Sequence, residues 1–134
     1  EESMIKFYYR QGCGSSQKAM SWFEKYKINV DSKRIGEISK QDLQKILSYM
    51  DGGLETITKR SSMSNPQTQN SLEMLLEMNL DEGLEYLSRN AYLLRSPIVL
   101  DDNKVQVGYN MDDLRQFFPR EYRRLELSTD QGFI

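Results

Sequence analysis

The sequence predicts a single α/β domain in which a β-α-β unit is followed by several helices and then by a β-β-α unit. Three observations carry this prediction: an apolar run at residues 4–9, helically spaced apolar residues after it, and two short apolar runs between residues 97 and 107. With 134 residues, the chain is long enough to bury a hydrophobic core in one domain.

The first three elements form the β-α-β unit. Residues 4–9 (MIKFYY) are typical of a strand and are followed by a loop at residues 10–12. From Ser15, apolar residues recur at the spacing of one helix face, and residues 28–34 alternate as a second strand. The residues of that helix face are Ala19, Trp22, Phe23 and Tyr26.

A helical insertion is expected at about residues 39–92. Ser39, with Asp42 three residues later, is a typical helix start, and residues 51–53 (DGG) are a typical helix end. Residues 58–70 are polar and contain a proline, so we expect a loop there. Leu72 then begins another helix, and Leu84 marks a further short one.

The last elements are a hairpin and a covering helix. Residues 97–100 and 105–107 are expected to pair about a turn at residues 101–103. Asn110 begins a helix that carries Leu114, Phe117 and Phe118 and is limited by Pro119. This order of elements is typical of a thioredoxin-like fold with helices inserted in the middle.

The composition narrows the possible chemistry. The chain has no histidine and one cysteine, which excludes Ser-His-Asp and Cys-His catalysis, an internal disulfide and a thiolate zinc cluster within this chain. With 18 basic and 20 acidic residues the net charge is −2, so strong DNA binding by the protein alone is not expected. No apolar run is long enough to span a membrane, and the acidic and polar first residues argue against a secretory signal peptide. We therefore expect a cytoplasmic protein.

The one cysteine, Cys13, is the candidate redox residue. It lies between the first strand and the first helix, where free backbone N–H groups and the helix dipole favour a thiolate. Ser16 occupies the position at which a two-cysteine motif carries its resolving thiol, so any redox cycle must use a sulfenic acid, a mixed disulfide or an intermolecular bridge. The alternative is that Cys13 is an inert small hydrophobic residue.

Two further features are expected near the thiol. Pro97 stands where thioredoxin-like folds place a cis-proline beside the active cysteine, although an ordinary trans proline opening an edge strand is the alternative. Arg10, Arg60 and Arg95 are the candidates for an anion site around Cys13, because a guanidinium suits oxyanions. For any one of them taken alone, solvated surface charge is the more common interpretation.

The sequence resembles the Spx family of Gram-positive transcription regulators, in the arsenate-reductase-like branch of the thioredoxin fold. The resemblance runs from Met4 to about Leu127 and is most specific at residues 93–98 (LLRSPI), 105–110 (VQVGYN) and 117–120 (FFPR). It implies one domain at residues 4–127, which leaves residues 1–3 as a scar of tag removal and residues 128–134 as a flexible tail.

The resemblance also implies a function. Spx proteins bind the C-terminal domain of the RNA polymerase α subunit and redirect transcription under thiol or oxidative stress. Gly52 matches the glycine of that contact, and residues 59–61 around Arg60 also fit. The resemblance further implies a monomer without a cofactor. It also implies control by an ATP-dependent cytosolic protease that reads the C-terminal tail, although this tail departs from the family's small and polar ending.

Departures from the two related patterns argue against an internal disulfide switch and against efficient arsenate reduction, while the single thiol keeps a thiol-dependent enzyme as the alternative. Many Spx proteins carry Cys-x-x-Cys, whereas this chain has Ser16. The loop also resembles the Cys-Gly-x-Ser-Arg loop of arsenate reductases, but Gln17 replaces its arginine, and Ser96 and Tyr109 stand at two of three oxyanion-binding arginines; Arg60 matches the third. A thiol-dependent reductase is therefore the second hypothesis, and a glutaredoxin-like module that holds an iron–sulfur cluster is the third.

Overall fold

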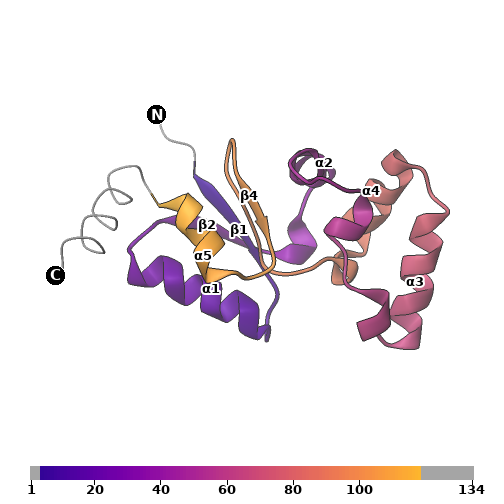
Figure 1. Cartoon of the computed structure of the whole chain (residues 1–134), viewed down its shortest axis with the longest axis horizontal. Coiled ribbons are helices and arrows are strands. Elements are labelled where there is room, and N and C mark those ends of the chain that lie inside the picture. The colour runs from indigo at the N-terminus through magenta and orange to yellow at the C-terminus, as the bar shows by residue number, and fades with distance from the viewer. Residues whose placement is uncertain (1–3, 119–134) are drawn as a thin grey trace.

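A four-stranded mixed sheet forms the centre of the protein, seen in a computed structural model that describes residues 4–118 (Figure 1). Its strand order is β2-β1-β3-β4. β1 pairs parallel with β2 and antiparallel with β3, and β4 pairs antiparallel with β3. The strands are β1 (Ile5–Tyr9), β2 (Val30–Arg34), β3 (Ile98–Leu100) and β4 (Val105–Val107).

The helices follow the predicted order. Within the described residues they are α1 (Gly14–Lys25), α2 (Lys40–Ser48), α3 (Pro66–Leu76), α4 (Leu80–Arg89) and α5 (Met111–Leu114). Single-turn 3-10 helices lie at Ile35–Glu37, Leu54–Thr56, Ser61–Met63, Ala91–Leu93 and Arg115–Phe117. The predicted α/β order, with its helical insertion between β2 and β3, is confirmed.

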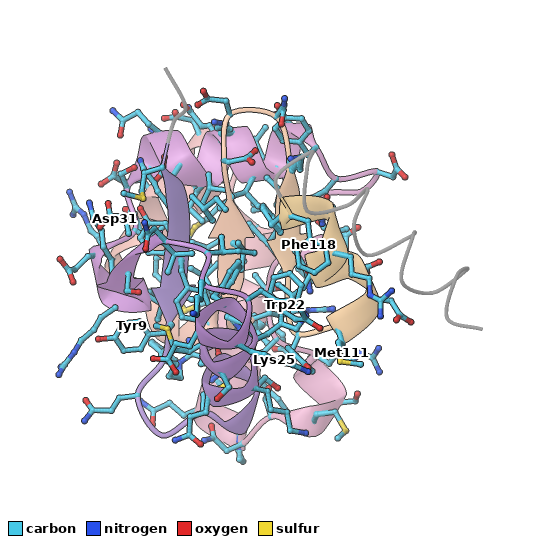
Figure 2. All side chains as sticks on the ribbon, turned by 90° about the vertical axis from the view of Figure 1, so that its left-hand side faces the viewer. Tyr9, Trp22, Lys25, Asp31, Met111 and Phe118 are labelled. Atoms are coloured by element: carbon cyan, nitrogen blue, oxygen red, sulfur yellow. The ribbon has the colours of Figure 1, made fainter. Side chains whose placement is uncertain are left out.

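One face of the sheet packs against α1 and α5 through aromatic side chains. Trp22 of α1 lies 4.9 Å from Phe118, ring centre to ring centre, and both are labelled in Figure 2. Phe23 of α1 meets Phe7 of β1 edge to face at 5.8 Å. Aromatic pairs in such geometries contribute beyond the area they bury. This packing fixes α1, and with it the loop at its start, against the sheet.

The other face packs against the insertion. Because side chains alternate along a strand, Phe7 and Val99 face the aromatic cluster while Tyr8, Ile98 and Leu100 face the insertion. α2 and α4 cover this face, and α3 lies beyond α4 at the end of the molecule away from α1 (Figure 1). The central residues of this second core are Leu43, Ile46, Ile57, Leu87, Leu93 and Leu94.

Two predicted boundaries were wrong. The predicted loop at residues 58–70 contains a 3-10 turn and the first residues of α3, which begins at Pro66 rather than at Leu72. The Asn65 side chain accepts a hydrogen bond from the Thr68 backbone N–H, and a proline is suited to the first helical turn because its missing N–H needs no partner there. The last helix is also shorter than predicted, since its α-helical part ends at Leu114.

Some sequence-based expectations fall outside the described residues. These are the scar at residues 1–3, the limit at Pro119, the domain's end at Leu127 and the tail at residues 128–134.

Candidate functional site

Cys13 stands at the start of α1, at the end of a tight turn from β1. Its backbone is extended, its N–H donates to the Arg10 carbonyl at 3.2 Å, and its carbonyl accepts from the Gln17 N–H at 3.0 Å. Gly12 makes the turn with a φ of +75°, a conformation that favours glycine. Gly14 has no positive φ, and a Cβ there, as at Gly12, would meet no atom within 4 Å. The turn therefore holds the thiol at the N-terminal end of the helix.

Two serine hydroxyls face the sulfur, and Arg10 orients both. The Ser96 Oγ lies 3.3 Å from the Cys13 Sγ and accepts a hydrogen bond from Arg10 Nη1 at 3.1 Å. The Ser16 Oγ accepts from the Arg10 backbone N–H at 3.1 Å. Because each oxygen receives a hydrogen from Arg10, each hydroxyl keeps its own hydrogen for the sulfur. The arrangement supplies two donors to a thiolate.

These donors lower the pKa of Cys13. Burial of the sulfur raises its pKa, but hydrogen bonds from the Ser96 and Ser16 hydroxyls and from the backbone N–H groups of Ser16 and Ser15 outweigh it, and the pKa falls to about 7. A thiolate is the nucleophilic form of cysteine. The lowered pKa favours the thiolate near neutral pH, which is the form that the redox hypothesis for Cys13 requires.

Arg10 ties the thiol loop to the helical insertion. Its Nη2 donates to the carbonyls of Ala91 at 2.9 Å and Leu94 at 3.1 Å, while Nη1 holds Ser96. Burial lowers the pKa of Arg10, and the neighbouring Cys13 partly opposes this. The guanidinium thus acts as a strut between β1 and residues 91–96, with most of its donors already used.

Sequence reasoning missed Lys59 as a cation near the thiol. Lys59 is half-buried, and burial together with the repulsion of Arg10 lowers its pKa, while attraction to Cys13 raises it. Its backbone N–H donates to the Leu93 carbonyl at 2.8 Å, which fixes this segment beside the thiol loop. The resemblance to Spx proteins includes residues 59–61, but it singles out Arg60, the neighbour of Lys59, as the cation.

The other predicted arginines lie elsewhere. Arg60 is exposed, and Arg95 donates from Nε to the Thr58 carbonyl at 2.7 Å. Among the hydrogen bonds of residues 4–118, none joins Arg60 or Arg95 to Cys13. The Ser96–Pro97 peptide bond is cis, as predicted for Pro97, and the Ser96 side chain before it contacts the Cys13 sulfur.

Gly52 belongs to a separate, exposed turn between α2 and the 3-10 helix at Leu54–Thr56. The Thr56 hydroxyl donates to the Gly53 carbonyl at 2.7 Å, and the Glu55 carboxylate accepts from the Gly53 N–H at 3.1 Å. A Cβ at Gly52 would lie 2.7 Å from the Thr56 Cγ2 and 2.8 Å from the Glu55 Oε2. The turn is folded closely enough that this position presents backbone to solvent.

The described residues contain neither a metal-ligand cluster nor a membrane-spanning helix. Between residues 4 and 118, no group of three or more Cys, His, Asp or Glu side chains is placed to hold a metal ion. In the same range, no helix has the length and apolar character needed to cross a membrane.

Known proteins resemble this chain along most of its length. The sequence model of the ArsC family matches residues 8–117. The global transcriptional regulator Spx of Streptococcus mutans is 32% identical over 126 residues, covering 92% of this chain and 90% of that protein. The Spx regulator of Streptococcus agalactiae serotype V is 33% identical with the same coverage.

Solved structures confirm the fold. The arsenate reductase from Vibrio cholerae superimposes with a TM-score of 0.70 at 11% identity. The superposition covers 88% of this chain and 100% of the reductase chain. At such low identity the likeness concerns the fold alone, and it agrees with the predicted arsenate-reductase-like form of the thioredoxin fold. On the match over residues 8–117 and the identity with the two Spx regulators, this chain belongs to the ArsC family, as a member related to Spx.

Proposed function

We propose that this protein is a transcriptional regulator that binds the C-terminal domain of the RNA polymerase α subunit and modulates transcription under thiol or oxidative stress. The observation that carries the proposal is the 32–33% identity with the Spx regulators over 92% of the chain. The proposed regulatory function is inferred from the relatives. The proposed contact surface and the proposed redox sensor are argued from this chain's own residues.

The exposed turn at Gly52 is the proposed contact. A flat patch of backbone lets a partner approach more closely than any side chain would allow. Here the Thr56 and Glu55 side chains hold the turn from below, so Gly52 stays accessible without a ligand. Arg60 adds an exposed cation further along the same segment.

Cys13 is the proposed sensor. Hydrogen peroxide oxidises its thiolate to a sulfenate with release of water. After the sulfenate takes up a proton from solvent, a small thiol condenses with the sulfenic acid to give a mixed disulfide and a second water. Ser16 cannot close an internal disulfide, so an external thiol must complete and later reverse the cycle. The pKa of about 7 favours the first step near neutral pH.

The experiment is a calorimetric titration of the purified protein with the isolated α-subunit domain, with and without reductant. Gly52→Arg should abolish saturable one-to-one binding, and Gly52→Ala is the matched control because it tests the crowding against Thr56 without a bulky charge. Unchanged affinity of Gly52→Arg, with unfolding temperatures equal to wild type, refutes the surface. Equal losses in both variants assign the effect to distortion of the turn instead.

A thiol-dependent reductase is the second candidate function, favoured by the low pKa of Cys13 and the nearby Lys59. The geometry gives it weaker support for arsenate, because Arg10 already spends its donors on Ser96 and two carbonyls. Each charged hydrogen bond missing from an oxyanion site costs about 1.5–3 kcal/mol of binding. Turnover of arsenate or of a mixed disulfide that is lost in Cys13→Ser would establish the enzyme. Binding to the α-subunit domain that survives in Cys13→Ser would not establish an enzyme, because a regulator can keep its partner without the thiol.

A further inference from the structure

A cavity of about 710 Å³ lies in the helical insertion; Lys59 of its lining is also near Cys13, and Glu55 of its lining also belongs to the turn at Gly52. Pockets for small organic molecules commonly measure about 300–1,000 Å³. Its walls come from α3, the start of α4 and residues 54–62, at the end of the molecule away from α1 (Figure 1). Its apolar lining consists of Leu54, Leu72, Leu75, Leu76, Met78 and Leu80.

The rim of this cavity leaves large apolar side chains uncovered. Leu76 is 80% exposed and Leu80 is 55% exposed, although both line the cavity. Uncovered apolar surface that adjoins a cavity is typical of a binding site. A ligand with an apolar body would bury both side chains.

Three cations line the cavity. Lys59, Arg60 and Arg95 all line the cavity, and none of the salt bridges within residues 4–118 includes any of the three. Arg95 uses its Nε on the Thr58 carbonyl, which leaves its terminal nitrogens for another partner. Two carboxylates, Glu55 and Glu73, line the cavity as well, and Glu55 is engaged by the Gly53 N–H. The lining therefore carries a cationic surplus in a protein of net charge −2.

We propose that this cavity binds an aliphatic carboxylate, whose chain lies on the leucines of α3 and α4 and whose carboxylate faces Lys59, Arg60 and Arg95. The three cations come from residues 59–60 and 95, whereas all the apolar side chains except Leu54 come from residues 72–80, and a molecule with one charged end matches this division. An extended acidic peptide is a poorer match, because the peptide's backbone would need hydrogen-bond partners on the protein along its length, whereas the described lining is mostly apolar.

The test is a titration of the whole protein with decanoate below its micelle concentration, followed by calorimetry and backbone NMR shifts. Saturable one-to-one binding is expected, with shifts centred on α3 and residues 58–62. Decanol and decyltrimethylammonium, which share the chain length, should bind at least tenfold more weakly, because they lack the anion that pairs with the arginines.

Matched variants separate the cationic from the apolar part of the lining. Arg60→Gln should weaken decanoate about tenfold or more and decanol little, while Leu76→Ser should weaken both. Both residues are exposed, so neither change is expected to unfold the protein. Lys18→Gln on α1 and Met111→Ser on α5 are the controls, since both residues are exposed and lie outside the cavity.

Several results would overturn the proposal. They are the absence of saturable decanoate binding, equal binding of decyltrimethylammonium, or affinities that Arg60→Gln and Leu76→Ser leave unchanged. Because the titration contains no RNA polymerase domain, its failure does not bear on the proposed regulator function. A peptide that binds where decanoate does not would assign the cavity to a protein partner.

Discussion

Replacing Ser96 by alanine should raise the pKa of Cys13. In the wild type, a pKa of about 7 against the ordinary value of 9.0 means that about half of the thiol is ionised at pH 7 instead of about one in a hundred. Ser96→Ala removes the hydroxyl that lies 3.3 Å from the sulfur. A hydrogen bond to a charged group contributes about 1.5–3 kcal/mol, and 1.36 kcal/mol changes an acid dissociation constant tenfold. The thiolate fraction at pH 7 should therefore fall to about a tenth or less.

The assay is the rate of alkylation by iodoacetamide as a function of pH, with thiolate absorbance at 240 nm as an independent readout. The midpoint of the profile is the quantity to compare, because a more basic thiolate is also more nucleophilic and the rate at one pH understates the change. Ser88→Ala is the matched control, since that hydroxyl bonds only to the Glu85 carbonyl in its own helix. A wild-type midpoint near 9, or an unmoved midpoint in Ser96→Ala, would refute the two-serine account of the thiol.

Three further predictions concern stability, each measured by urea unfolding. Because the pKa of Cys13 is lower in the folded protein, the free energy of unfolding of wild type relative to Cys13→Ser should increase between pH 7 and 9 and lose this contribution as the pH falls through 7. Gly12→Ala should cost about 1–2 kcal/mol, because φ is +75° there. Asp42→Ala should cost roughly 1–3 kcal/mol, because the buried Tyr8 hydroxyl donates to that carboxylate.

Each of these predictions has its own control. A pH-independent difference between wild type and Cys13→Ser would contradict the lowered thiol pKa. For the turn, Gly36→Ala should leave stability nearly unchanged, since it has no positive φ and a Cβ there would meet no atom within 4 Å. For Asp42, the partner change Tyr8→Phe should make the two losses less than additive, and strict additivity would show that the two side chains do not interact.

The fold could be predicted from the sequence because its signals are local. The apolar period of α1 and the Ser39–Asp42 helix start each describe a single element, and the structure places both as expected. The start of α3 was also local, in the Asn65-Pro66 pair, but the polar composition of the segment concealed it. The start of a helix such as α3 depends on one capping side chain, so a prediction that weighs only the composition of the segment places that start wrongly.

The surroundings of the thiol could be predicted only in part. The position of Cys13 at a helix start follows from the strand-loop-helix order, and Ser16 follows from the same helix. Lys59 and Ser96 reach the site from residues 46 and 83 positions away in the sequence, through the pairing of residues 57–59 with 93–95. No periodicity in a single sequence reports such a pairing, so the sequence predicts Arg10, Arg60 and Arg95 as the cations near the thiol and omits Lys59.

The hydrogen bonds of Arg10 connect the loop of Cys13 to the end of the helical insertion. Arg10 holds Ser96 against the sulfur and, through the Ala91 and Leu94 carbonyls, holds the end of the helical insertion. The same stretch pairs with residues 57–59, because the Arg95 N–H donates to the Ile57 carbonyl at 3.0 Å. An adduct on the sulfur would lie next to Ser96, whose Oγ is 3.3 Å from the Cys13 Sγ and is held by Arg10. The same hydrogen bonds join the loop of Cys13 to residues 57–59 of the insertion that carries Gly52.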